Sequence, residues 1–137
     1  MYSVSDSHSA SHILIVDDDE INRWIAKCLV ERLGHQVTTV INGAEALAAT
    51  MSTSFDLVLM DIEMPVMNGL EATRALRKRE RGGAHMPVVA LTALGPGSLR
   101  RILDAGLDGY LAKPASLEEL RKMLESLLPR KERASCG

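Results

Sequence analysis

The sequence predicts an α/β domain in which a parallel sheet carries helices on both faces. Short apolar runs alternate five times with longer segments of helical periodicity, which is typical of this class. The apolar runs contain almost no charge, and such runs favour strands that are buried on both faces. We therefore expect a doubly wound, five-stranded parallel sheet.

The first strand is predicted at residues 12–16, an aliphatic run that ends in four consecutive acids, residues 17–20. Asp19 is a candidate N-cap for the helix that follows. Leu33-Gly34 is typical of the end of this helix. Its expected core face consists of Ile21, Ile25, Cys28 and Leu29.

The second strand, at residues 36–40, is partly polar and suits a sheet edge. Asn42-Gly43 predicts a turn before the second helix. The third strand is the uncharged run 57–60, which ends at Asp61, and a helix at about 69–79 follows it. We expect the basic run 74–81 to be a solvated helix end, where cations complement the helix dipole. The apolar stripe expected on the second helix consists of Ala44, Leu47, Ala48 and Met51.

The fourth strand is predicted at residues 87–91 and ends at Thr92. Gly95-Pro96-Gly97 predicts a loop, and Ser98 is the expected cap of a short helix that reaches residue 105. The fifth strand, 109–112, ends at Lys113-Pro114. A last helix begins after the capping-box pattern Ser116-x-x-Glu119. Its expected core residues are Leu117, Leu120, Leu124 and Leu127.

The 137 residues amount to one domain, with 46% apolar and 25% charged residues. The net charge of −2 favours neither a nucleic acid nor a membrane surface as a direct partner. The two cysteines lack metal-type spacing and indicate reduced thiols in a cytoplasmic protein. The Ser-rich residues 1–11 are expected to be a disordered lead or linker, residues 12–128 the domain, and residues 129–137 a polar tail.

Four of the five predicted strands end in residues of chemical interest, and a parallel sheet gathers these ends on one edge. They are Asp17, Asp18, Asp61, Thr92 and Lys113. Three close carboxylates repel one another by roughly 4 kcal/mol per pair at a surface-like dielectric constant. They therefore call for a cation, and their hard oxygen ligands suit Mg²⁺. A lysine and a hydroxyl beside them match phosphoryl oxygens, and a carboxylate is a competent nucleophile for an acyl phosphate.

The motifs IVDDDE, DLVLMDIEMPVMNG, VVALTA and YLAKP stand in this order across residues 12–128. Taken together they resemble the receiver domain of two-component response regulators. The resemblance implies a flavodoxin-like (βα)5 fold with strand order 2-1-3-4-5. It also implies a phosphorelay module that switches partner interactions, with self-phosphorylation and autodephosphorylation as its only reactions.

The resemblance assigns roles to residues at matching positions. Asp61 would be the phosphoacceptor. Asp18, Asp61 and the backbone carbonyl of Glu63 would bind Mg²⁺ directly, and Asp17 would act through a water molecule. Thr92 and Lys113 would hold the phosphoryl group, and Tyr110 would be the aromatic switch that follows Thr92. The Lys113-Pro114 bond matches one that is usually cis in the family.

The wording MDIEMPVMNGLEATRALR and HMPVVALTA is similar to receivers fused to hybrid sensor kinases. The phosphodonor would then be a phosphohistidine on a histidine kinase or a histidine phosphotransfer domain. The segment between Thr92 and Gly106 is about one residue short of the common spacing, which predicts a late or mobile fourth helix. Glu63 and Leu94 are expected to tune the lifetime of the phosphoryl group.

Two rival readings come from other classes. A small haloacid-dehalogenase-like phosphatase would use Asp17 as its nucleophile in Asp17-x-Asp19, although no cap domain is evident. A flavodoxin-like nucleotide binder is disfavoured because no Gly-rich phosphate loop follows the first strand. Bland alternatives also exist for single residues: helix capping by Asp17 and Asp18, and simple packing by Tyr110. Trp24 is either a half-exposed packing residue or part of a partner surface.

Overall fold

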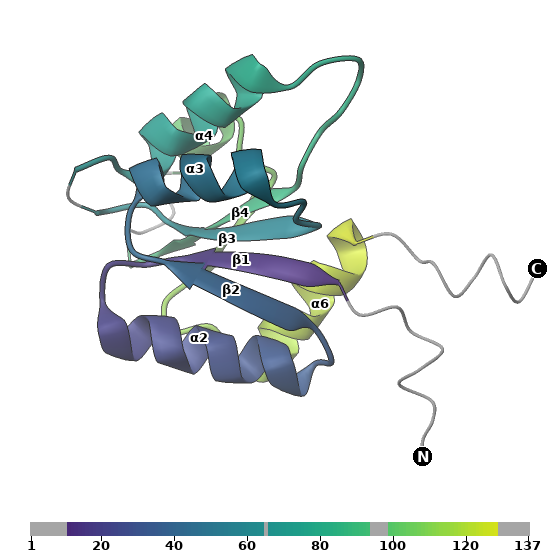
Figure 1. The fold of residues 1–137 in the computed structure, drawn as a ribbon. Helices are drawn as coiled ribbons and strands as arrows, with labels where there is room; N and C mark the ends of the chain where they lie inside the picture. The colour runs from purple at the N-terminus through teal and green to yellow at the C-terminus, as the bar shows by residue number, and fades with distance from the viewer. Residues whose placement is uncertain (1–10, 65, 94–98, 129–137) are drawn as a thin grey trace, which may run out of the picture.

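The computed structural model describes residues 11–64, 66–93 and 99–128, which alternate between strands and helices (Figure 1). The elements, in chain order, are β1 (His12–Val16), α2 (Glu20–Arg32), β2 (Gln36–Val40), α3 (Gly43–Ser52), β3 (Leu57–Asp61), α4 (Gly69–Arg79), β4 (Val88–Thr92), α5 (Leu99–Asp104), β5 (Gly109–Ala112) and α6 (Leu117–Leu127). The expected lead, the tail, Leu94, the 95–97 loop and the Ser98 cap lie outside the described residues.

The strands form one parallel sheet in the order β2-β1-β3-β4-β5, which confirms the predicted topology. Val16 pairs with Met60, Asp61 with Leu91, and Thr92 with Ala112. This register aligns the carboxyl ends of the strands. The residues that follow β1, end β3 and β4 and follow β5 therefore meet at one edge of the sheet.

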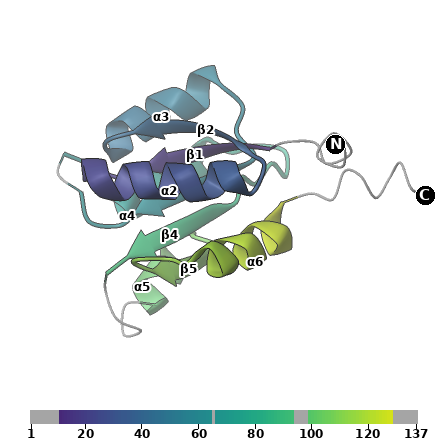
Figure 2. The same cartoon turned by 90° about the horizontal axis from the view of Figure 1, so that it is seen from below.

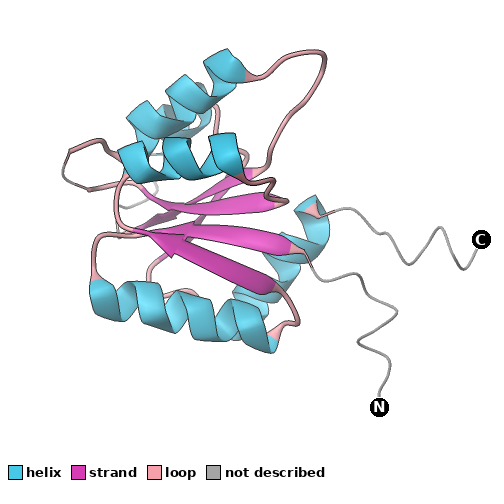
Figure 3. Cartoon of the chain, in the orientation of Figure 1, coloured by secondary structure: helices cyan, strands magenta, loops and turns pink. Residues whose placement is uncertain are grey.

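Helices cover both faces of the sheet (Figures 1 and 3). α3, α4 and α5 pack on one face, around a core that includes Val58, Met60 and Ile102. α2 and α6 pack on the other face, which is turned toward the viewer in Figure 2, around Ile15, Leu59 and Leu120. β1, β3 and β4 lie in the interior of the sheet and are buried along their lengths, as uncharged runs predict.

Local signals fix most helix ends as expected. Asp19 caps α2 by accepting a hydrogen bond from the backbone N–H of Asn22. Ser116 and Glu119 form the capping box of α6. Gly34, with φ of 95°, follows the last turn of α2 in the left-handed conformation that glycine permits. Asn42, expected in a turn, is instead the N-cap of α3.

The expected apolar faces of α2 and α3 are partly wrong. Ile21 and Ile25 are 67% and 42% exposed, and the residues of α2 that are buried are Ala26 and Val30. In α3 the stripe residues Ala44, Ala48 and Met51 face solvent. Gly43 and Ala46 are buried there in their place, and Leu47 packs against the core as expected. Small residues make these contacts because they let the helices approach the sheet closely.

The basic run at the end of α4 is solvated at Arg74, Lys78 and Arg81, as expected, but Arg77 is partly buried. The guanidinium of Arg77 donates to the carbonyl oxygens of Gly106 and Met86 and to the carboxylates of Glu80 and Asp108. Asp108 also accepts from the backbone N–H of Val88. Arg77 therefore joins the end of α4 to the beginnings of β4 and β5.

Candidate functional site

The chemistry-bearing side chains lie at the carboxyl edge of the sheet. Asp17 follows β1 and is 1% exposed, and Asp61 ends β3 and is 5% exposed. Asp18, next to Asp17, is exposed at the mouth of the site. One carboxylate oxygen from each of Asp17, Asp18 and Asp61 lies within 4.8 Å of the others. The predicted three-carboxylate cluster is therefore present.

Lys113 follows β5 and reaches two of these acids. Its Nζ lies 2.9 Å from Oδ2 of Asp17 and 3.2 Å from Oδ1 of Asp61. Its backbone N–H donates to the carbonyl oxygen of Thr92 at 2.9 Å, which joins the ends of β4 and β5. The Lys113-Pro114 bond is cis, as the resemblance implied.

Backbone N–H groups complete the surroundings of the two buried acids. Oδ1 of Asp17 accepts from the N–H of Asp19 at 2.9 Å, and Oδ1 of Asp61 accepts from the N–H of Glu63 at 3.3 Å. Thr92 ends β4 and is 1% exposed, one position beyond Leu91, which pairs with Asp61. Tyr110, on β5, is half-buried and packs against the core under α3, α4 and α5.

The electrostatics of this cluster are unbalanced. The pKa of Asp61 is raised to about 6, first by burial and then by the neighbouring Asp17 carboxylate, while Lys113 and the N–H of Glu63 act in the opposite direction. Burial alone would lower the pKa of Lys113, but its pairs with Asp17 and Asp61 leave it above its ordinary value. One ammonium thus faces three carboxylates, and a divalent cation would correct the excess negative charge.

The donor set fits Mg²⁺ because all ligand atoms are oxygens and one carboxylate is open to solvent. The backbone N–H of Glu63 lies beside Asp61, so the segment that carries the predicted carbonyl ligand is next to the cluster. Sequence reasoning missed Arg23, whose Nη1 donates to the carbonyl oxygen of Asp17 at 2.9 Å. A contact from a side chain to the main chain leaves no residue pattern that would have revealed it.

The arrangement makes the phosphatase reading unfavourable. Both carboxylate oxygens of Asp17 are engaged, one by the N–H of Asp19 and one by Lys113. Asp61, which would have no role in such a phosphatase, shares Lys113 with Asp17.

Among the helices of residues 11–128 that the structure describes, none has the length and apolar character needed to cross a bilayer.

Fold and site together define a class: doubly wound α/β domains with a magnesium-type acid cluster, a hydroxyl and a lysine at the carboxyl edge of the sheet. The model of the response regulator receiver domain family matches residues 13–125. The chain therefore belongs to the receiver domain family.

Curated relatives of the chain include sensor histidine kinases. The chain is 40% identical over 121 residues to the sensor histidine kinase GacS of Pseudomonas protegens. This alignment covers 86% of this chain and 13% of that protein. It is 38% identical over 116 residues to the aerobic respiration control sensor protein ArcB of Escherichia coli, covering 85% of this chain and 15% of that protein. The chain thus spans a small part of the relatives that it matches.

Solved receiver structures show the same fold. The receiver domain of the sensor histidine kinase PA1611 from Pseudomonas aeruginosa, with a magnesium ion in its active-site cleft, matches at a TM-score of 0.78 and 36% identity, covering 87% of this chain and 98% of that one. The chemotaxis response regulator CheY4 of Vibrio cholerae matches at 0.80 and 31%, covering 88% and 100%. The flavodoxin-like prediction is confirmed.

Proposed function

We propose that Asp61 accepts a phosphoryl group from a phosphohistidine, with Mg²⁺ held by Asp18, Asp61 and the backbone carbonyl of Glu63. The observation that carries the proposal is the Lys113 ammonium, which lies between the buried Asp17 and Asp61 beside a third carboxylate. Asp17 would contact the ion through a water molecule, because both of its own oxygens already accept hydrogen bonds.

The reaction is an in-line displacement at phosphorus. A bond forms from an Asp61 oxygen to phosphorus as the bond from phosphorus to the histidine nitrogen breaks, and the released imidazole takes up a proton. Mg²⁺, when bound, would supply positive charge to the phosphoryl oxygens during the transfer. Lys113 pairs with one of these oxygens, and the hydroxyl of Thr92 donates to another. Hydrolysis of the acyl phosphate by water later returns Asp61.

Phosphorylation of Asp61 would shift the domain between two conformations, and partner proteins would respond to this shift. Thr92 moves toward the phosphoryl group, and Tyr110 on the adjacent strand β5 turns inward behind it. Tyr110 is half-buried in the structure, so a change of its rotamer alters the surface near α5. Glu63, exposed two residues after Asp61, affects how readily water reaches the acyl phosphate.

The donor is a histidine kinase or a histidine phosphotransfer domain, because the relatives carry this domain within kinases. Such a protein must bring its histidine to Asp61 and so must cover the neighbouring surface. Ile21 and Trp24, 67% and 63% exposed, lie on the first turns of α2 and line a groove of about 490 Å³ with Arg23 and Lys27. We assign this surface to the phosphodonor protein. We expect the domain to make no direct contact with nucleic acid or membrane, and we place the reaction in the cytoplasm.

Incubation with acetyl phosphate and Mg²⁺, followed by intact and peptide mass spectrometry, tests the proposal. We expect one phosphoryl group on Asp61, removed by hydroxylamine, with labelling abolished by D61N and by EDTA. A label on another residue, or turnover of generic phosphate esters through Asp17, would contradict the proposal.

A further inference from the structure

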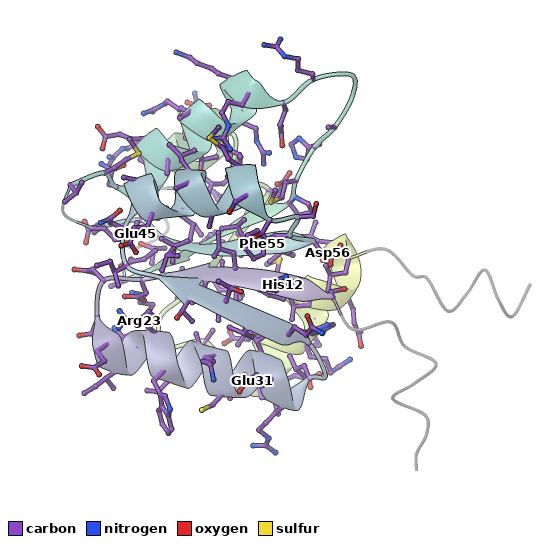
Figure 4. All side chains as sticks on the ribbon, in the orientation of Figure 1. His12, Arg23, Glu31, Glu45, Phe55 and Asp56 are labelled. Carbon is purple, nitrogen blue, oxygen red and sulfur yellow. The ribbon has the colours of Figure 1, made fainter. Side chains whose placement is uncertain are left out.

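Arg23 contacts the main chain of the β1–α2 loop, whereas Lys113 contacts the carboxylate of Asp17 in the same loop. Among the described residues, no carboxylate pairs with Arg23. Its Nη1 donates to the carbonyl oxygen of Asp17 at 2.9 Å. Figure 4 places Arg23 near the start of α2, on the side of the helix that faces the sheet. Its backbone N–H donates to the carbonyl of the N-cap residue Asp19, so Arg23 lies one turn into the helix. Helix side chains lean toward the N-terminus, which directs this one back to the loop.

The peptide that Arg23 holds is the one that joins Asp17 to Asp18. On its N-terminal side, the N–H of Asp17 donates to the carbonyl oxygen of Val40 at 3.2 Å. The carbonyl of Asp17 belongs to the same peptide plane as the N–H of Asp18. Fixing this oxygen limits rotation of the peptide plane before Asp18. The plane after Asp18 is held by the N–H of Asp19, which donates to Oδ1 of Asp17, and the two planes together set the direction of the Cα–Cβ bond of Asp18.

The orientation of Asp18 depends on this main-chain contact because its carboxylate has no hydrogen-bond donor among the described residues. Asp17 is held through both carboxylate oxygens, and Asp61 by Lys113 and the N–H of Glu63. Asp18 is exposed, and among the described residues none donates a hydrogen bond to its carboxylate. Its orientation therefore follows from the main chain.

We propose that Arg23 is a positioning residue of the acidic site: by holding the Asp17 carbonyl, it orients Asp18 for Mg²⁺ and raises the affinity for the ion. This inference rests on the proposed function of the cluster as a magnesium site. Outer contacts that orient metal ligands typically change metal affinity by about 10- to 100-fold.

The sign of the effect separates positioning from charge. If the charge of Arg23 alone mattered, its removal would strengthen Mg²⁺ binding, because a cation near the ion repels it. If orientation matters, R23M weakens Mg²⁺ binding, and R23K, which keeps a donor and the charge, restores part of it. R32M, at the exposed end of the same helix, removes an equal charge far from the loop and serves as the matched control.

The experiment is isothermal titration calorimetry of Mg²⁺ into wild type, R23M, R23K and R32M, with circular dichroism to establish folding and thermal unfolding with and without Mg²⁺. We expect Kd to rise about tenfold in R23M, less in R23K and not in R32M, with a smaller Mg²⁺-induced rise in Tm for R23M. Should R23M fail to fold, R23K decides the question.

An unchanged or lower Kd for Mg²⁺ in R23M would overturn the assignment. If R23M does not fold, an unchanged Kd in R23K would overturn it instead. A lower Tm without a higher Kd would show only that the contact stabilises the fold. A wild-type protein that binds no Mg²⁺ would instead overturn the proposed function, so the two failures are distinguishable.

Discussion

Gly69, the first residue of α4, lies directly against the main chain of Asp61. A Cβ placed on Gly69 would lie 2.3 Å from the carbonyl oxygen of Asp61 and 2.8 Å from Cγ of Met60. The N–H of Gly69 also donates to the carbonyl oxygen of Ile62 at 2.9 Å. The start of α4 and the strand that carries the phosphoacceptor are therefore packed backbone to backbone.

Gly69→Ala should destabilise the domain and displace Asp61, because main-chain atoms cannot move aside as a flexible side chain can. We expect a loss of about 2–4 kcal/mol in the free energy of unfolding, measured by urea denaturation, together with weaker Mg²⁺ binding. Gly34→Ala is the control: Gly34 has φ of 95° and open space around it, so it reports the backbone cost alone. Equal losses at both glycines would contradict the close-packing argument.

Asp61→Asn should stabilise the metal-free protein at neutral pH. The folded pKa of about 6 lies above the unfolded 3.8, so the folded state binds the extra proton, and this contribution to stability is lost as pH rises through about 6. Asn carries no charge and avoids that loss, so we expect D61N to be more stable than wild type by about 2 kcal/mol at pH 7 and by much less near pH 4. Urea unfolding across this range, without Mg²⁺, measures the difference; a difference independent of pH would contradict it.

Trp24→Ala should slow phosphoryl transfer from a phosphohistidine protein, because Trp24 is exposed on the surface assigned to the donor. Loss of a central aromatic contact commonly costs 2 kcal/mol or more, which predicts a fall in transfer efficiency of about 30-fold. Labelling by acetyl phosphate needs no docking and should change little. Met51→Ala on α3, 75% exposed, is the matched control and should leave both rates unaltered.

His35 makes a pH-dependent contact at the opposite edge of the sheet. Its Nδ1 accepts from the backbone N–H of the buried Ser11, and burial lowers the pKa of His35 below 6.5 although Asp56 opposes this. Below 6.5 the unfolded state binds more protons than the folded state, so stability falls as the pH drops through that region.

His35→Gln, which keeps an acceptor but does not titrate, should remove this dependence. The effect of Asp61 has the opposite sign at acidic pH, so the comparison belongs in the D61N background. Parallel pH profiles of stability for D61N and D61N/H35Q would show that the His35 contact does not contribute.

The strand ends and the acid cluster were predictable because their signals are local, whereas the strand order followed from the resemblance to the receiver family. An uncharged run identifies a buried strand, and the residue that follows it, such as Asp17 or Lys113, is then placed at the sheet edge by topology alone. Capping at Asp19 and Ser116 depends on the same kind of short-range chemistry.

Helix orientation and arginine contacts were not predictable in this way. Ile21 and Ile25 follow helical spacing but face solvent, while Ala26 and Val30 are buried, because a small residue allows close packing that hydrophobicity alone does not indicate. Arg23 and Arg77 bind main-chain carbonyls, and Arg77 reaches Gly106, far along the chain. Every residue offers such an acceptor, so only the folded arrangement selects one.

The first strand begins at His12 and the last helix ends at Leu127, both on the side of the sheet away from Asp61. Figure 4 shows His12 and Asp56 at one end of the sheet and Arg23 at the other. Polypeptide joined to either end of the domain would therefore begin on the side opposite Asp61. The domain can be fused to other domains at either end without blocking the approach of a phosphohistidine to Asp61.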